Sequence, residues 1–368
     1  MAVCRLPKIL ARAGCRVNLL SFEGSLASSS RHLVRHVSIA KSENSPFAQE
    51  LCAHLEDRPY FYQWIIIGDD VTFYELAAQA DKSWLKEWFP VEPGSDAVEL
   101  CSSKASFVGL CDEIGISIPR SRVCHNLVQV RDAADAFVYP LVLKKAYGCA
   151  GKAVRRVDSA HNLEPAYCEL AGEQPLVVQQ FVDGLVGSTA VLFDRGTPAA
   201  WISAYKHLSW PTPFSPSCQR RFMLHDDIPS ICQKLGKRLG FHGLCGFDWI
   251  HRPQDDSLCV LEFNMRPTPL LHLGHHCAVD FGYGARAMLD GHSLLQPPQK
   301  ADINDRILYM FPQDLYRSLA EVDWRGLLRW FPGAALHDIP WDEPRMMARM
   351  LWNCRGHMKN GVLGLLPS

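Results

Sequence analysis

The chain has 368 residues, enough for two or three domains with full hydrophobic cores. Its composition is that of an ordinary soluble globular protein, with 48% hydrophobic residues, 21% charged residues and a formal net charge of −1. This near-neutral balance argues against broad electrostatic binding to nucleic acid, and no apolar run approaches the roughly 18 residues that span a bilayer. We therefore expect neither nucleic acid nor a membrane among its partners.

The fourteen cysteines are spread along the chain and contain no Cys-x-x-Cys pair. A secreted protein held together by disulfides would be shorter and richer in cysteine. The pattern favours reduced, mostly buried thiols in a cytoplasmic protein.

The first 42 residues allow two interpretations. They are rich in arginine and serine and contain a single acidic residue, Glu23, which is typical of an organellar transit peptide. The stretch LPKILARAGCRVNLLSF instead predicts a helix that stops at Gly14 and a buried strand from Val17 to Phe22. We favour the second interpretation, in which this segment opens an α/β domain.

The stretch FYQWIIIGDD (61–70) predicts a continuous apolar strand, and VTFYELAAQA after it predicts a helix. A strand that ends in Gly-Asp-Asp before a helix suits an open parallel sheet with ligands at the strand ends. We therefore expect residues 1–100 to form a small, Rossmann-like α/β domain with a parallel sheet.

The middle of the chain alternates strands, hairpins and helices. A helix is expected over 102–115, capped by Ser102 or Ser103 and ended by Gly115. The remaining expected elements are two strands around a glycine loop (139–157), a strand (176–184), a hairpin through 194–196 (188–207), a helix closed at Gly240 (228–243) and a hairpin turning at 253–257 (244–267).

The stretch LEFNMRPTP (261–269) carries an unusual set of polar residues on a strand. Leu261, Phe263 and Met265 alternate as core-facing residues should, so Glu262, Asn264 and Arg266 share the opposite face. The turn at 253–257 would place Asp248 across from Glu262. Two carboxylates and an amide oxygen are hard ligands suited to Mg²⁺. The alternative is a solvated strand face with one weak surface ion pair.

The stretch LKKAYGCAGKAV shifts the balance between these alternatives. Lys144 ends an apolar strand, and Gly148 and Gly151 allow the following backbone to approach phosphates closely. The spacing is not that of a P-loop, and alone it is typical of a plain hairpin. Together with the carboxylate and amide set, it indicates a nucleoside triphosphate bound with Mg²⁺.

The order of motifs from about 102 to 275 resembles the ATP-grasp superfamily, in the carboxylate–amine ligase form of biotin carboxylase and D-alanine–D-alanine ligase. The motifs are SKASFVGLCDEIGISIP, YPLVLKKAYGCAGKAV, VVQQFVDG, GFDWI and LEFNMRP. The resemblance assigns nucleotide binding to Lys104, Lys144, Gly148, Gly151, Lys152, Gln179, Gln180, Phe181 and Val182. It assigns metal binding to Asp248, Glu262 and Asn264, and catalysis to Arg266 and Lys144. Val186 stands near the place of the usual ribose-binding Glu, with Asp183 as an alternative.

The resemblance also implies a domain plan. An N-terminal α/β domain (1–100) would precede a two-lobed ATP-grasp domain (101–295) with antiparallel sheets. The lid lobe would cover about 115–182 and the metal-binding lobe about 183–295. The C-terminal extension (296–368) would pack on the core or on the substrate pocket. A homodimer is the default oligomeric state.

The implied reaction activates a small-molecule carboxylate with ATP as an acylphosphate and condenses it with an amine, releasing ADP and phosphate. The cofactors would be ATP and Mg²⁺, with Mn²⁺ as the alternative ion. Candidates for gripping substrate are Lys206, His207, Arg220, Arg221 and His275. Two other hypotheses remain open: ATP-dependent phosphorylation at an enol or another non-carboxylate oxygen, and a regulatory protein with a degenerate nucleotide site.

The C-terminal motifs FPQDLYR and HDIPWDEP suggest no chemistry by themselves. Asp338, Trp341 and Asp342 would either line a substrate pocket or belong to a packed cap, which we favour. His272 and His276 have the i, i+4 spacing of zinc ligands, but no acidic or cysteine partner is evident, and structural or substrate-contacting roles are favoured.

Overall fold

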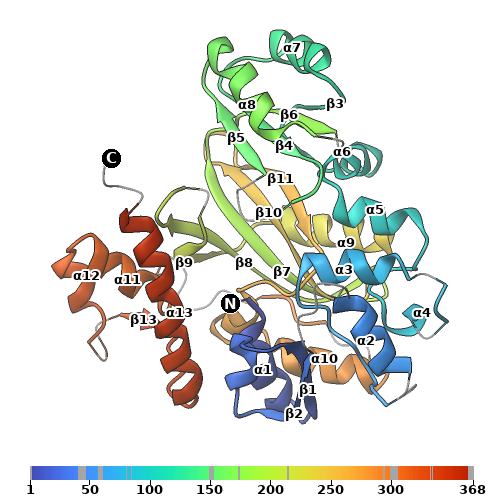
Figure 1. Cartoon of the computed structure of the whole chain (residues 1–368), viewed down its shortest axis with the longest axis vertical. Helices are drawn as coiled ribbons and strands as arrows, with labels where there is room; N and C mark the ends of the chain where they lie inside the picture. The colour runs from blue at the N-terminus through green and yellow to red at the C-terminus, as the bar shows by residue number, and fades with distance from the viewer. Residues whose placement is uncertain are drawn as a thin grey trace. The chain divides into compact units, whose positions relative to one another are not determined.

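The computed structural model describes residues 2–39, 47–56, 61–79, 81–83, 85–148, 153–172, 175–213, 215–292, 295–298, 306–331, 333 and 335–363 (Figure 1). The chain divides into two compact units. The first comprises Met1–Gly68, Ala199–Leu224 and Pro267–Ser368, and the second comprises Asp69–Pro198 and His225–Arg266. The units interleave along the sequence because the chain leaves and re-enters each of them.

The first unit begins with the helix and strand expected from the sequence. Helix α1 (Leu6–Arg12) is followed by Gly14, whose φ of 82° stops it, and by β1 (Val17–Phe22). Strand β1 pairs in parallel with β2 (Leu33–Ile39). Helix α2 (Phe47–Glu56) follows. The predicted parallel pairing in the N-terminal segment is confirmed.

The strand predicted at 61–70 is wrong. Residues 61–69 carry no strand, and Ile67 is buried while Ile65 and Ile66 are only half-buried. A short apolar run fits a buried connection as well as a strand. The helix expected after it is present as α3 (Asp70–Ala77), which Asp69 caps by accepting a hydrogen bond from the Thr72 amide at 2.9 Å.

The rest of the first unit contains the following elements: β8 (Thr197–Ser209, from Ala199 onward), β9 (Ser217–Met223), α10 (Phe281–Leu289), β12 (Ile307–Tyr309), α11 (Gln313–Ala320), α12 (Trp324–Leu328), β13 (Leu336–His337) and α13 (Pro344–Leu363). Its strands pair in the order β8-β9-β12-β13. The short helices η1 (Ala2–Arg5), η2 (Leu26–Ser29) and η4 (Leu271–Cys277) complete it.

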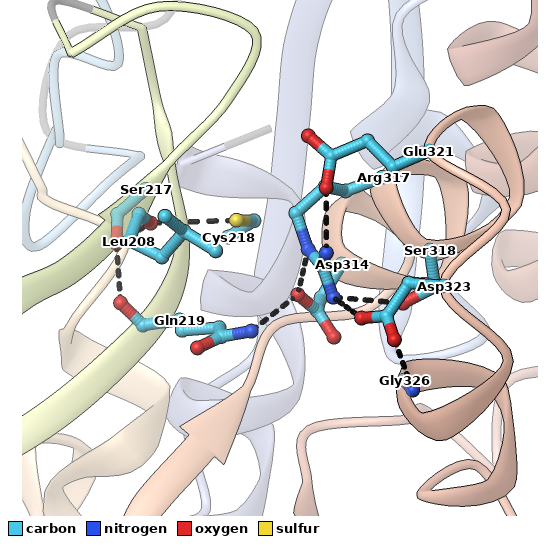
Figure 2. A network of polar contacts seen from close by, with 10 residues as sticks. All are labelled: Leu208, Ser217, Cys218, Gln219, Asp314, Arg317, Ser318, Glu321, Asp323 and Gly326. Carbon is cyan, nitrogen blue, oxygen red and sulfur yellow. Dashed lines mark hydrogen bonds and ion pairs between the residues drawn. The ribbon is translucent and has the colours of Figure 1, made fainter.

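The FPQDLYR motif forms a buried polar network at the start of α11 (Figure 2). The Asp314 carboxylate accepts a hydrogen bond from Gln219 at 2.7 Å and one from Arg317 at 2.8 Å. Arg317 also donates to Glu321 at 2.8 Å and to Asp323 at 3.0 Å. Asp314 is fully buried, so its charge requires these partners. The motif therefore anchors α11 to β9 rather than presenting groups to solvent.

The HDIPWDEP motif holds the C-terminal segment against the N-terminal one. The buried Asp338 carboxylate accepts hydrogen bonds from His272 at 2.9 Å and from the Phe311 amide, and its backbone carbonyl accepts one from Arg5 at 2.8 Å. Burial raises the pKa of Asp338, but these donors together hold it below the ordinary value. Asp342 pairs with Lys8 at 2.6 Å. These contacts are those of a packed cap, the interpretation favoured from the sequence.

The second unit contains the predicted lid lobe (about 115–182) and only part of the predicted metal-binding lobe (about 183–295), because Ala199–Leu224 and the chain from Pro267 onward belong to the first unit. Its helices are α3, α4 (Leu85–Trp88), α5 (Asp96–Ser102), α6 (Lys104–Glu113), α7 (Leu127–Ala136), α8 (Leu163–Leu170) and α9 (Asp227–Leu239), with η3 (Ala160–Asn162) before α8. Ser103 caps α6 by accepting a hydrogen bond from the Ser106 amide, and Gly240 closes α9 with a φ of 60°. Both helix ends were predicted.

Four of its strands form an antiparallel sheet in the order β3-β6-β4-β5: β3 (Ser121–Cys124), β6 (Leu176–Gln180), β4 (Leu141–Lys145) and β5 (Val154–Val157). Helices α7 and α8 cover one face of it (Figure 1). Leu141, Leu143 and Val178 point into the core on that face. The intervening residues, Lys144 among them, therefore point to the opposite face.

The remaining strands of this unit pair antiparallel in the order β11-β10-β7: β7 (Leu185–Asp194), β10 (Gly243–Arg252) and β11 (Ser257–Asn264). The ladder shifts by one residue between Asp248 and Trp249, since Asp248 faces Glu262 but Trp249 faces Val260. Leu261 is thus the extra residue of a β-bulge. It is half-buried, so the prediction that Leu261 faces the core in step with Phe263 is wrong. Val260 and Phe263 are the buried pair.

No helix in the described part of the chain has the length and hydrophobicity to cross a membrane.

Candidate active site

The hairpin of β10 and β11 places the predicted metal ligands on one face. Asp248 and Glu262 are direct cross-strand partners, and Asn264, two residues beyond Glu262, faces Gly246. Phe247 and Phe263 occupy the other face and are buried. One face of the hairpin therefore packs the core while the other carries two carboxylates and an amide.

Lys144 is buried near these carboxylates. It lies on β4, its side chain points away from the helix-covered face, and the residue is only 8% exposed. The pKa of Lys144 is about 8, because burial and, to a smaller extent, the nearby Lys104 lower it while Glu262 and Asp248 raise it. The site thus holds a desolvated ammonium group whose charge the two carboxylates only partly balance.

Lys104, the first residue of α6, reaches two parts of the site. Its Nζ donates a hydrogen bond to the Gly148 carbonyl at 2.7 Å and lies 3.6 Å from the Glu262 carboxylate. Its backbone amide donates to the Ala146 carbonyl at 2.8 Å. Lys104 therefore joins the start of the glycine loop to the metal-ligand face. Gly151 and Lys152 lie outside the described residues.

Arg266, just after β11, is positioned by a residue from another element. Its Nε donates to the Asp70 carboxylate at 3.0 Å, and both side chains are largely buried. Asp70 is the first residue of α3. The Gly-Asp-Asp signal before a helix drew attention to this position in the sequence, but nothing in the sequence pairs it with Arg266.

The side chains of the predicted hinge are largely engaged within the small sheet. Gln179 is buried and donates to the Ser121 hydroxyl at 2.9 Å. Gln180 makes two hydrogen bonds to the backbone of Val138. The backbone amides of Gln180 and Phe181 donate to the carbonyls of residues 120 and 140. These two amides are committed to the sheet, so an adenine edge at this place would meet carbonyl oxygens and the chain from Val182 onward.

Two further features of this region were not predicted from the sequence. Arg156 shares the face of Lys144, because it pairs with Val142 on β4, and its guanidinium lies 4.5 Å from the centre of the Phe181 ring. The Tyr147 hydroxyl donates to the Glu99 carboxylate at 2.6 Å, next to Gly148. The position of Arg156 depends on strand register, and the contact of Tyr147 with Glu99 depends on packing between distant segments. Neither can be recognised from a local sequence pattern.

The substrate candidates Lys206, His207, Arg220, Arg221 and His275 all belong to the other unit. Lys206 and Arg220 face each other across β8 and β9, and the Arg221 guanidinium lies 4.9 Å from the Tyr205 ring. Burial and Arg221 lower the pKa of His207. The His275 and His276 rings lie against each other at a tilt of 37°, with centres 3.9 Å apart. His272 is bonded to Asp338, and the described residues show no metal-ligand group that contains His272 and His276.

The start of β7 departs from the usual ribose-binding pattern. Val186 is 37% exposed and Asp183 is exposed as well, so neither is committed to the core. Gly184 and Gly187, on either side of Val186, lie too close to neighbouring groups to carry a side chain. A Cβ on Gly184 would lie 2.5 Å from the His251 carbonyl oxygen, and one on Gly187 would lie 2.0 Å from the Trp249 ring.

The donor set fits a divalent cation and phosphates. Carboxylate and amide oxygens on one face are ligands for Mg²⁺, and a desolvated lysine whose charge is only partly balanced gains favourable Coulomb energy from an added anion. Asp248, Glu262, Lys104 and Lys144 thus place both signs of charge where a metal–phosphate complex requires them.

Comparisons with known proteins identify a related family and related folds. Residues 101–269 match a family model described as an ATP-grasp domain. The carbamoyl phosphate synthase large chain of Deinococcus deserti is 24% identical over 182 residues, which are 46% of this chain and 18% of that protein. The carbamoyl-phosphate synthase of Methanobrevibacter smithii is 22% identical over 219 residues, 56% of this chain and 58% of that one. This chain therefore spans less than two thirds of either relative.

Solved structures show the same fold. An N5-carboxyaminoimidazole ribonucleotide synthetase in complex with ADP superimposes with a TM-score of 0.63 at 15% identity, covering 87% of this chain and 82% of that one. Biotin carboxylase from Campylobacter jejuni gives a TM-score of 0.63 at 15% identity, covering 79% and 69%. The fold class predicted from the sequence is confirmed.

Proposed function

We propose, from the premise that residues 101–269 are an ATP-grasp domain, that the protein is an ATP-dependent ligase. It would activate a small-molecule carboxylate as an acylphosphate, release ADP, and condense the activated acid with an amine. The observation that carries the proposal is the convergence of Lys104 and Lys144 with Asp248 and Glu262.

The role proposed for each residue follows from its charge. Asp248, Glu262 and Asn264 would hold Mg²⁺, which when bound draws charge from the phosphate oxygens. Lys104 and Lys144 would bind the phosphates of ATP, and the low polarity around Lys144 strengthens this attraction. Desolvation holds the pKa of Lys144 near 8, so it is still mostly protonated at neutral pH.

Arg266 would stabilise the phosphoryl group as it moves to the carboxylate, and Asp70 would hold the guanidinium in place. Electrostatic groups that are fixed before the reaction need no reorganisation during it. The start of the glycine loop is tied down by Lys104 at Gly148 and by Glu99 at Tyr147.

The test is a screen for ADP release with carboxylic acids and amines supplied in pairs. Bicarbonate belongs among the acids, because the structural relatives include a biotin carboxylase domain bound to bicarbonate. We expect ADP release that requires one acid and is completed to an amide by one amine. Release of AMP and pyrophosphate would contradict the proposal, as would ATP turnover that persists unchanged in Glu262→Gln.

A further inference from the structure

A second cluster of metal-ligating side chains lies at the turn end of the β10–β11 hairpin, separate from the phosphate-binding face. It consists of His225 before α9, His251 near the end of β10, and Asp256 in the turn. All three belong to the second unit, and their ligand atoms lie within 4.8 Å of one another. Among the described residues it is the one group of this composition.

The contacts within the cluster converge on Asp256. His251 Nε2 lies 2.8 Å from Asp256 Oδ1, and His225 Nε2 lies 3.7 Å from the same oxygen. His251 is 9% exposed, whereas the Asp256 side chain is 83% exposed. His251 is thus held in the protein interior, whereas Asp256 leaves the cluster open to solvent at the turn.

We propose that His225, His251 and Asp256 bind a transition-metal ion of the Zn²⁺ type. Two imidazole nitrogens and one carboxylate oxygen suit Zn²⁺, with water as a fourth ligand, whereas Mg²⁺ prefers oxygen ligands alone. With bonds of the usual length, ligand atoms around tetrahedral zinc are roughly 3.3 Å apart. The two distances from Asp256 Oδ1 to the histidine nitrogens, 2.8 and 3.7 Å, lie on either side of this value, so a small rotation of the exposed Asp256 adjusts both.

Binding of a metal through His225 Nε2 requires the other tautomer of this imidazole. In the present arrangement His225 Nε2 donates to the Asp256 carbonyl at 2.9 Å, and Nδ1 accepts a long hydrogen bond from the Asp227 amide at 3.2 Å. The Asp227 carboxylate lies 3.8 Å from the same Nδ1. When the proton moves to Nδ1, the hydrogen bond from the Asp227 amide is lost, the new Nδ1–H turns to the Asp227 carboxylate, and the Nε2 lone pair faces Asp256. A carboxylate behind a histidine is the usual support of a zinc ligand.

A metal ion here would join the hairpin turn to the start of α9. The turn also has contacts of its own: Ser257 donates to Asp255 at 2.7 Å, and Arg252 lies 3.0 Å from the Asp255 carboxylate. The site shares no residue with the face of Asp248 and Glu262. Binding of Zn²⁺ is therefore expected to be independent of Mg²⁺ and of ATP.

The test uses the full-length protein, freed of metal with a chelator, and titrates it with Zn²⁺ by calorimetry and with Co²⁺ by visible absorption. We expect one ion per chain and the absorption of tetrahedral Co²⁺ with nitrogen and oxygen ligands. Asp256→Asn and His251→Gln should abolish this signal, and Asp227→Asn should weaken binding by about 10-fold. Excess Mg²⁺ should not compete.

The matched controls are His161→Ala, an exposed histidine of the same unit, and Glu262→Gln, which alters the other site; both should bind Zn²⁺ as the wild type does. Asp256 is exposed, so its variant keeps the test valid even if a change at the buried His251 disturbs folding. Absence of a one-to-one site, thiolate-to-cobalt charge transfer, or unchanged binding in Asp256→Asn would overturn the proposal and reduce the cluster to a hydrogen-bonded turn.

Discussion

Replacing the buried Lys144 with methionine should make the ligand-free protein more stable while removing its response to ATP. Methionine has nearly the same length and no charge, so it fills the space without the cost of a desolvated ammonium group. That cost is visible in the pKa of Lys144, which burial lowers from 10.5 to about 8. At about 1.36 kcal/mol per pKa unit, the shift corresponds to about 3 kcal/mol at neutral pH.

The expected gain for Lys144→Met is therefore about 1–3 kcal/mol in the free energy of unfolding, where the upper value is the full cost of the charge. Because the pKa of Lys144 is lower in the folded protein than in the unfolded chain, the free energy of unfolding also depends on pH. Between pH 8 and 10.5 the unfolded chain holds the Lys144 proton and the folded protein does not, so wild-type stability rises with pH in that window. The advantage of the variant should be complete below pH 8 and should vanish toward pH 10.5.

The assay is urea unfolding of wild type and variant across that pH range, with and without Mg²⁺ and a non-hydrolysable ATP analogue. Lys145→Met is the matched control, because Lys145 is the next residue of β4 and points to the other face. The control should keep the stabilisation by nucleotide. A Lys144→Met protein that is less stable than wild type at pH 7, or that is still stabilised by the analogue, would refute the reasoning.

Three other changes have expected outcomes. Glu262→Gln should abolish ATP turnover with little change in unfolding midpoint, because the residue is a partly exposed metal ligand in our proposal; retained ADP release would refute that role. Val186→Glu should bind ATP about 10-fold more tightly but leave 2′,3′-dideoxyATP affinity unchanged, as measured by calorimetry, because a charged hydrogen bond to the ribose contributes about 1.5 kcal/mol. Equal gains for both nucleotides would count against a ribose contact. Gly187→Ala should lower stability by about 1–3 kcal/mol in thermal unfolding, because its Cβ would overlap Trp249, whereas Gly109→Ala on the exposed side of α6 has open space and should not destabilise.

The local signals of this sequence predicted elements well where turn chemistry and periodicity agree. Gly240 ends α9, Ser103 caps α6, and the turn at 253–257 sets Asp248 opposite Glu262. Each of these features depends on residues that are close in sequence, so the local sequence pattern is sufficient to predict it. The run at 61–69 failed because burial alone does not distinguish a strand from a connection.

The interactions that position the site could not be read in the same way. Asp70 and Arg266 are 196 residues apart, and Tyr147 and Glu99 are 48 apart. Pairing at such separations is decided by how elements pack, and no local propensity encodes it. The same holds for Gln219 and Asp314, which are 95 residues apart and whose hydrogen bond between β9 and α11 became evident only from the three-dimensional arrangement (Figure 2).

The bulge at Leu261 changes which residues of β11 face the core on its two sides. On the Asn264 side, Phe263 faces the core and Glu262 faces the site. On the turn side, the alternation of core-facing residues begins again at Val260. The hairpin therefore accommodates one extra residue on the turn side of Glu262 while Asp248 and Glu262 still face each other. A search for this site in other sequences should fix each carboxylate by its buried neighbours, Phe247 and Phe263, and leave their spacing open.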